Sequence, residues 1–400
     1  MRLFLFCGSL AVGKGGAERI ATELATEMQR RGNDVWLGFN GPGAPAYLVP
    51  DGISLYRRDR KDDAGFQRDL LEIDPDVIFI FYTNQELLSL YRTVGGLGIP
   101  VAIQECTNPE RLYRNNWRSS SGRCSESLWE RELVASGCVR LRMVMPGYED
   151  SFPEYIRQNV RAFPNYAMPP LVGEREMDSS RKRIINIGGL KRNKNLSALL
   201  LAFSQLSGKH DDWDLYVYGG GTPATDSYRV EVDELIERHD LAGRVFFPGA
   251  VQNISYEYQC ADLHVITSPS EGCPGCVLEA MAHGIPSIGS STCHGTNMLI
   301  TPENGILYDG ENEVPSLIEA LNALMRDPAL RERMGKTARE DAASYSPERT
   351  YEQWETLFSE AASYKGNMDR LYDEQLAVDP ERARHMFRNR KKLLESMGAV

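Results

Sequence analysis

The chain has 400 residues, of which 42% are hydrophobic and 25% are charged, and its formal net charge is −11. This composition excludes an intrinsically disordered chain, and the acidic balance argues against nucleic acid as a partner. No apolar run approaches the ~20 residues that span a bilayer, and the length indicates two domains. The eight cysteines are scattered in a chain without a recognisable secretion signal, which favours reduced thiols and a cytoplasmic location.

The chain opens on the apolar run RLFLF, which predicts a buried strand, and continues into GSLAVGKGG at 8–16. The spacing Gly8-x4-Gly13-Lys14 is that of a P-loop, whose backbone cradles nucleotide phosphates. A P-loop also needs Ser or Thr after the lysine to bind magnesium, and here that residue is Gly15. A P-loop ATP-binding protein therefore stays as an alternative. The turn leads into a helix that we expect to end at Gly32.

Short apolar runs alternate with helical patterns along the rest of the chain, which is typical of parallel sheets covered by helices on both faces. In the first half we predict strands at 2–7, 34–39, 77–82, 100–104 and 142–145. A proline-rich polar segment at 164–181 predicts an interdomain linker. In the second half we predict strands at 184–190, 214–221, 244–251, 262–268, 286–291 and 305–309, with helices at 195–208 and 227–243.

The fold that this order predicts is α/β, with two doubly wound Rossmann-like domains facing a central cleft. The N-terminal acceptor-side domain would cover 1–165 and the donor domain 181–365. The charged, helix-prone tail at 366–400 would pack back on the N-terminal domain.

The stretch SPSEGCPGCVLEAMAHG at 268–284 carries the strongest chemical signal. A strand ends near Ser268 and a helix starts near Gly275, so Glu271 in the loop and Glu279 in the helix can face the same cleft. The first N–H groups of a helix have no intrahelical partner and lie at its positive dipole end, which suits a diphosphate. Here those groups belong to Gly275, Cys276 and Val277. Glu279 could accept hydrogen bonds from a ribose, and Glu271 from sugar hydroxyls.

A second segment, GGLKRNKN at 188–195, also lies between a strand and a helix. It places Gly188 and Gly189 at the turn and Lys194 just before the helix, where a cation could meet the same phosphates.

Together these segments resemble the donor half of the retaining glycosyltransferases of family 4, which have the GT-B fold. Glu271 and Glu279 match the family's E-x7-E pattern in spacing. GGAER at 15–19 resembles the Gly-rich loop of the subgroup that makes lipid-linked oligosaccharides and surface polysaccharides, so Gly15 and Gly16 would approach the donor phosphates or the acceptor. Further matches are VYGGG at 217–221, RVFFPGAVQN at 244–253 and NGILYD at 304–309.

The resemblance implies transfer of a sugar from a nucleotide-sugar, most often UDP-linked, to a hydroxyl of a glycan or lipid-linked glycan. No metal and no other cofactor is expected. Lys194 and the helix N-terminus would stabilise the leaving diphosphate, and the reaction would take place in the cytoplasm or at the cytoplasmic face of the membrane.

The chain departs from the family pattern at three places. Gly189 stands where relatives have a phosphate-binding arginine, and Arg192 or Lys191 could replace it. Met298 occupies the position of a donor-binding glutamate. Where many relatives have a histidine in the cleft, the sequence reads Gln104-Glu105-Cys106, and we carry Glu105 over as a candidate catalytic residue.

Three further features need an explanation. Cys273-x-x-Cys276 followed by Cys293-His294 has a spacing compatible with zinc, so a zinc- or thiol-dependent regulatory protein is a second alternative. His283 is interpreted as a packing residue.

The basic aromatic stretch from Arg111 to Arg118 could make a peripheral contact with an anionic membrane.

Overall fold

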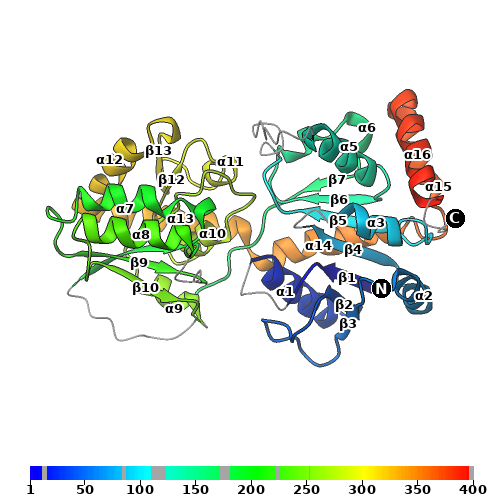
Figure 1. Ribbon diagram of the computed structural model, residues 1–400, viewed down its shortest axis with the longest axis horizontal. Coiled ribbons are helices and arrows are strands. Elements are labelled where there is room, and N and C mark those ends of the chain that lie inside the picture. The colour runs from blue at the N-terminus through cyan, green and yellow to red at the C-terminus, as the bar shows by residue number, and fades with distance from the viewer. Residues whose placement is uncertain are drawn as a thin grey trace. The chain divides into compact units, whose positions relative to one another are not determined.

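The computed structural model describes residues 1–10, 16–82, 87–109, 123–171, 181–220, 226–251 and 253–395. The chain divides into two compact units: unit 1 comprises Met1–Pro164 and Thr350–Val400, and unit 2 comprises Asn165–Arg349. Each unit is a parallel β-sheet with helices packed on it (Figure 1). The prediction of two doubly wound Rossmann-like domains is confirmed.

The sheet of unit 1 has the strand order β3-β2-β1-β4-β5-β6-β7, with every described pair parallel. Five strands agree with the predicted ones to within two residues. The edge strands β3 and β7 were not predicted, because SLYRR is strongly charged and VRA is too short to show a pattern. The strands are β1 (Arg2–Cys7), β2 (Asp34–Asn40), β3 (Ser54–Arg58), β4 (Val77–Tyr82), β5 (Val101–Glu105), β6 (Arg140–Met143) and β7 (Val160–Ala162).

The helices of unit 1 come from both ends of the chain. They are α1 (Gly16–Arg30), α2 (Asp63–Ile73), α3 (Leu87–Val94), α5 (Arg123–Ala135), α6 (Glu154–Arg157), α14 (Pro347–Ala362), α15 (Asp369–Val378) and α16 (Pro380–Glu395), with a 3-10 turn at Tyr148–Ser151. In Figure 1 the last helix, α16, coloured red, stands at the edge of this unit, and it contacts α3 and α5.

The chain returns to unit 1 earlier than predicted. The sequence placed the end of the donor domain at residue 365, whereas the structure divides the chain between Arg349 and Thr350. The reason is aromatic packing, because Trp354 and Phe358 of α14 meet Phe79 of β4 with ring centroids 5.0 and 5.5 Å apart. These rings belong to the core of unit 1, so α14 packs in that unit.

Unit 2 holds the sheet β10-β9-β8-β11-β12-β13, again parallel at every described pair. The strands are β8 (Lys182–Ile187), β9 (Trp213–Tyr218), β10 (Val245–Gly249), β11 (Leu263–Val265), β12 (Ser287–Ser290) and β13 (Gly305–Tyr308). The helices are α7 (Leu196–Ser204), α8 (Ser227–Arg238), α9 (Ile254–Gln259), α10 (Gly275–Ala282), α11 (His294–Asn297), α12 (Glu313–Arg326) and α13 (Pro328–Ala342). Short 3-10 turns lie at Arg192–Lys194, Gly310–Asn312 and Ala343–Tyr345.

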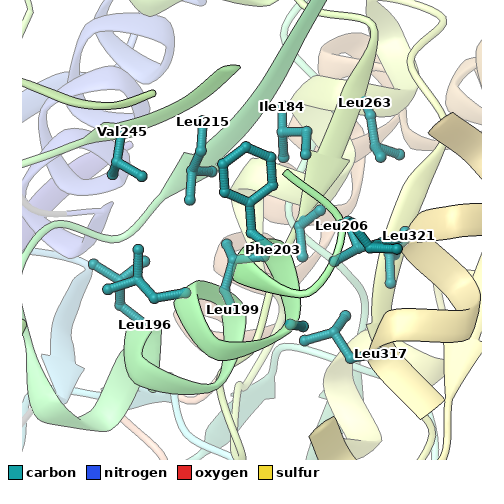
Figure 2. Packing of buried hydrophobic residues seen from close by; sticks show 14 of the residues in the cluster. Ile184, Leu196, Leu199, Phe203, Leu206, Leu215, Val245, Leu263, Leu317 and Leu321 are labelled. Atoms are coloured by element: carbon teal, nitrogen blue, oxygen red, sulfur yellow. The ribbon is translucent and has the colours of Figure 1, made fainter. Parts of the chain in front are cut away.

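Both faces of the unit 2 sheet are buried, and alternate residues of one strand serve the two faces. Ile184 of β8 belongs to a large apolar cluster. Figure 2 shows Phe203 of α7 within it, together with residues of the sheet and of α12. Its neighbour Ile185 belongs to the opposite cluster, with residues of α9 and α10. This two-sided burial explains why the adjacent residues Ile184 and Ile185 of β8 are both apolar and why α10 is fixed against the sheet.

Among the residues that the structure describes, no helix is long and apolar enough to cross a membrane.

Candidate active site

The strand order of unit 2 brings two of the predicted site segments together. β8 and β11 are hydrogen-bonded neighbours at the centre of the sheet, with β9 and β10 on one side and β12 and β13 on the other. The strand order therefore reverses between β8 and β11, and ligands of such sheets bind beyond the carboxyl ends of the strands at this switch point. Lys194 follows β8 and Glu271 follows β11, so both residues lie at the expected place.

Lys194 and Glu271 form an ion pair. Lys194 Nζ donates to Glu271 Oε1 at 2.6 Å, and their side chains are 26% and 16% exposed. Burial alone would lower the pKa of Lys194, but the Glu271 carboxylate raises that pKa above its ordinary value. The lysine is therefore a charged group that holds its proton, next to a carboxylate that it can exchange for a ligand.

The backbone around Lys194 is also fixed. The residue closes a 3-10 turn, and the next residue, Asn195, has the left-handed conformation with φ 49°, which asparagine tolerates better than most residues. The Thr267 hydroxyl, just beyond β11, donates to the Lys194 carbonyl at 2.9 Å. Thr267 was not predicted as a site residue, because its contact with a turn far away in sequence depends on the strand order.

Helix α10 begins at Gly275, where the sequence predicted it. Pro274 precedes the helix, its side chain makes no cap, and its carbonyl accepts hydrogen bonds from the amides of Val277 and Leu278. Because Val277 N–H is used within this turn, the amides of Gly275 and Cys276 are better placed than that of Val277 to bind an anion.

The first turn of α10 lies close to the predicted charged residues. Burial raises the pKa of the Cys276 thiol to about 12, and the charges of Glu271, Lys194 and Glu279 also act on it. Glu279 itself is 6% exposed. The structure therefore gathers Lys194, Glu271, Glu279 and the start of α10 in one region of unit 2.

His283 has a packing role, as predicted. Its two ring nitrogens lie 2.7 Å from the Glu279 carbonyl oxygen and 2.7 Å from the Ser255 hydroxyl. Its ring also stacks on Tyr258 at 5.1 Å.

Glycines line the carboxyl ends of the neighbouring strands β8 and β9. Gly189 has φ +65°, and a Cβ atom there would lie 2.5 Å from the Gly220 carbonyl oxygen. A Cβ atom on Gly188 would lie 3.0 Å from the Lys194 side chain. An arginine therefore does not fit at position 189 in this backbone conformation.

The two residues considered as substitutes for that arginine lie on the 3-10 turn or just before it. Arg192 donates to Glu231 at 2.9 Å and lies over the Tyr228 ring at 4.9 Å. Its side chain is 63% exposed, and these contacts direct it toward α8. Lys191 is exposed, and its part in phosphate binding stays a prediction.

Glu105 lies in unit 1 at the end of β5 and is 4% exposed. Arg131 donates to both of its carboxylate oxygens, at 2.8 to 3.2 Å. The same guanidinium binds Ser151 and stacks on Phe152 at 3.7 Å. Arg131 therefore gives Glu105 a partner that sequence reasoning had not foreseen, and the catalytic role of Glu105 stays a prediction.

Several predictions fall outside the described residues. They concern Lys14 and Gly15 of the Gly-rich loop and the basic aromatic stretch from Arg111 to Arg118. Gly16 is described and is the first residue of α1.

The cysteine pattern does not build a metal centre. The described part of the chain contains no group of three or more His, Cys, Asp or Glu side chains that could hold a metal ion. Cys276 and Cys293 form no disulfide, and burial raises the pKa of both thiols.

Comparisons with known proteins indicate the class of enzyme. Residues 173–341 match the family model of glycosyl transferases group 1. The chain is 22% identical over 355 residues to an uncharacterized glycosyltransferase of Haemophilus influenzae, covering 86% of this chain and 96% of that protein. It is 24% identical over 360 residues to the amylovoran biosynthesis glycosyltransferase AmsD of Erwinia amylovora, with the same coverage of 86% and 96%. The chain is a glycosyltransferase.

The fold of this glycosyltransferase is GT-B. The solved structure of Anabaena Alr3699/HepE in complex with UDP-glucose superposes with a TM-score of 0.74, at 17% sequence identity and with 90% of this chain and 100% of that chain covered. The comparisons favour neither the ATP-binding alternative nor the zinc- or thiol-dependent one.

Proposed function

We propose that this glycosyltransferase is a retaining enzyme of the family 4 type, which moves a sugar from a UDP-sugar to a hydroxyl of a glycan or lipid-linked glycan. The observation that carries the proposal is the Lys194–Glu271 pair at the switch point of unit 2, beside the start of α10. The UDP-glucose complex of Alr3699/HepE and the part of AmsD in amylovoran biosynthesis support the donor and acceptor classes.

Each group of the site has a defined part in the proposed reaction. The amides of Gly275 and Cys276 bind the diphosphate, and Glu279 accepts hydrogen bonds from the ribose hydroxyls. Glu271 accepts hydrogen bonds from hydroxyls of the transferred sugar. Lys194 exchanges part of its contact with Glu271 for the diphosphate, whose negative charge grows as the bond to the sugar breaks.

The proposed chemistry needs no further group. The bond between the sugar's anomeric carbon and the β-phosphate oxygen breaks, and the acceptor oxygen bonds to the same face of that carbon. The proton of the acceptor hydroxyl passes to the departing phosphate oxygen. Lys194 and the α10 dipole supply the positive charge, so we expect full activity in EDTA. An absolute requirement for manganese would contradict this assignment.

The test is a thermal-shift screen of nucleoside diphosphates and nucleotide-sugars, because ligand binding to the folded state raises the apparent stability. We expect UDP and one or more UDP-sugars to raise the unfolding temperature equally with magnesium and with EDTA. The control variant Glu279→Ala should lose most of this shift. Stabilisation by ATP that disappears in Lys14→Ala would favour the P-loop alternative instead.

We also propose that the enzyme meets its acceptor at the cytoplasmic face of a membrane, through the basic aromatic stretch from Arg111 to Arg118. Each basic residue near an anionic surface contributes about 1 kcal/mol, and salt screens this attraction. Sedimentation with anionic vesicles should weaken as salt rises and should fail with neutral vesicles. Binding that ignores salt would rule out this contact.

A further inference from the structure

The loop that carries Glu271 is held by a residue that the proposed reaction does not use. The side-chain amide of Asn165 donates to the carbonyl oxygen of Cys273 at 3.3 Å. Cys273 lies between Glu271 and Pro274, the residue that precedes α10. The bond therefore acts on the short backbone segment that joins the sugar-binding carboxylate to the phosphate-binding helix.

Asn165 is the first residue of unit 2, and the backbone before it is anchored in unit 1. The Arg142 guanidinium donates to the carbonyls of Phe163 and Pro164 at 3.0 and 2.9 Å. Arg142 is completely buried and lies over the rings of Phe163 and Trp354, at 4.4 and 4.7 Å. A buried guanidinium held by two carbonyls and two rings is costly to displace, so the peptide leading into Asn165 has little freedom.

The backbone after Asn165 is fixed as well. The amide of Ala167 donates to the Tyr345 carbonyl at 2.7 Å, so the two chain segments at the border of unit 2 are joined there. Pro164 contributes a rigid φ angle directly before Asn165. Within unit 2, the Asn165 amide therefore meets the Cys273 carbonyl next to a backbone segment that is itself hydrogen-bonded.

Gly272, the residue before Cys273, is packed closely too. A Cβ atom on Gly295 of α11 would lie 2.3 Å from the Gly272 carbonyl oxygen, so only glycine allows this approach. The loop therefore has close packing at Gly272 and a directed hydrogen bond at Cys273. Displacing a reacting group by about 1 Å can cost 10²-fold in rate.

We propose that Asn165 is a positioning residue for Glu271: its hydrogen bond to the Cys273 carbonyl sets the loop so that the carboxylate meets the transferred sugar. This inference rests on the proposed function. Glu279 and the amides of Gly275 and Cys276 lie on α10, whose core residues are buried against the sheet. The contacts to UDP should therefore tolerate the loss of Asn165 better than the contact to the sugar.

The experiment uses the full chain with Asn165→Ala and the nearly isosteric Asn165→Asp, which keeps the side-chain shape but cannot donate. We expect the Kd for UDP to stay within about twofold of the wild-type value, while kcat for sugar transfer falls about tenfold. The preference for UDP-sugar over UDP in binding should fall as well. If Asn165→Ala folds poorly, Asn165→Asp supplies the same loss of the hydrogen-bond donor.

The matched control is Asn304→Ala. Asn304 also lies in unit 2, is buried, and donates to a backbone carbonyl, that of Leu299, at 3.1 Å. Its loss should lower the unfolding temperature and leave both kcat and the Kd for UDP within about twofold. An Asn165 variant that behaves like this control would show a structural role alone and would overturn the proposal.

A double-mutant cycle tests whether Asn165 acts through Glu271. In a Glu271→Ala background, adding Asn165→Ala should change kcat less than twofold, because the group to be positioned is already absent. A further tenfold loss would overturn the proposal. The failure of the proposed function would look different, since the wild-type chain would then bind no UDP in the first place.

Discussion

Each unit contains an ion pair between a glutamate and a basic side chain, and the two pairs differ in hydrogen-bond geometry and in exposure. Glu105 ends strand β5 in unit 1, and Glu271 follows strand β11 in unit 2, so both carboxylates lie beyond parallel strands. Arg131 binds both oxygens of Glu105, and the two side chains are only 11% and 6% exposed. Lys194 reaches one oxygen of Glu271, and those side chains are 26% and 16% exposed.

This difference separates a structural pair from one that can bind a ligand. A guanidinium that engages both oxygens of a carboxylate and stacks on Phe152 makes a rigid unit with little capacity for new partners. A lysine ammonium is a compact charge on a flexible stem with three donors, so it can turn from Glu271 to a diphosphate. Sequence reasoning predicted a catalytic role for both carboxylates, and the predictions below test whether their different partners distinguish them.

The largest expected effect is on stability, in unit 1. Arg131→Ala leaves Glu105 buried without its cation, which should lower the free energy of unfolding by about 3–5 kcal/mol. The control is Arg30→Ala, because Arg30 pairs with Glu27 on the surface with its side chain 65% exposed and should contribute at most about 1 kcal/mol. Urea unfolding of both variants measures the difference, and equal losses would contradict the structural assignment of Glu105.

The next effect is on turnover, in unit 2. Lys194→Ala removes the charge that meets the leaving diphosphate, so kcat should fall by about 10²–10³-fold with a smaller change in KM. Lys336→Ala, on a lysine side chain that is 79% exposed on α13, is the control and should keep wild-type kinetics. Steady-state assays with the UDP-sugar found in the ligand screen decide the matter. A Lys194→Ala enzyme with unchanged kcat would exclude the proposed role.

A smaller effect distinguishes the two glutamates of unit 2. Glu279→Ala should cost roughly 1.5–3 kcal/mol of UDP binding, or about 10- to 150-fold in Kd, because charge-assisted hydrogen bonds to the ribose are lost. Glu271→Ala should leave the Kd for UDP nearly unchanged and reduce turnover, because in the proposed function Glu271 binds the transferred sugar and not UDP. Calorimetric titration with UDP measures both variants. Equal losses of affinity would show that this division of roles is wrong.

The smallest expected effect is the contribution of the Lys194–Glu271 pair to stability. The pair is partly exposed, so it should contribute only about 1 kcal/mol or less. Although burial opposes it, the Glu271 carboxylate raises the pKa of Lys194 above 10.5. The contribution is therefore complete below pH 10.5 and is lost as the pH rises through the pKa of the folded state. The stability difference between wild type and Lys194→Met should stay constant from pH 7 to 9.5 and shrink above pH 10.5; a difference that shrinks already below pH 9 would contradict the raised pKa.

The sequence by itself determined the features that depend only on residues close together in the chain. Alternating apolar runs and helical patterns predicted the α/β class, and the glycine and proline before VLEAMA predicted the start of α10 at Gly275. The spacing of Glu271 and Glu279 placed one residue in the loop and the other in the following helix, because both are local structures. These signals are short in range, so they can be read without knowing the strand order.

The tertiary structure decided which distant residues meet. The ion pair between Lys194 and Glu271 exists because β8 and β11 are neighbours at the switch point, and the strand order is not encoded in any periodic pattern. The same holds for the return of Trp354 to unit 1, which set a domain border that the sequence placed too late. It also holds for the ion pair between Arg131 and Glu105 and for the hydrogen bond from Asn165 to the Cys273 carbonyl. Such contacts join segments far apart in the chain, and packing and hydrogen-bond geometry in the folded state select them.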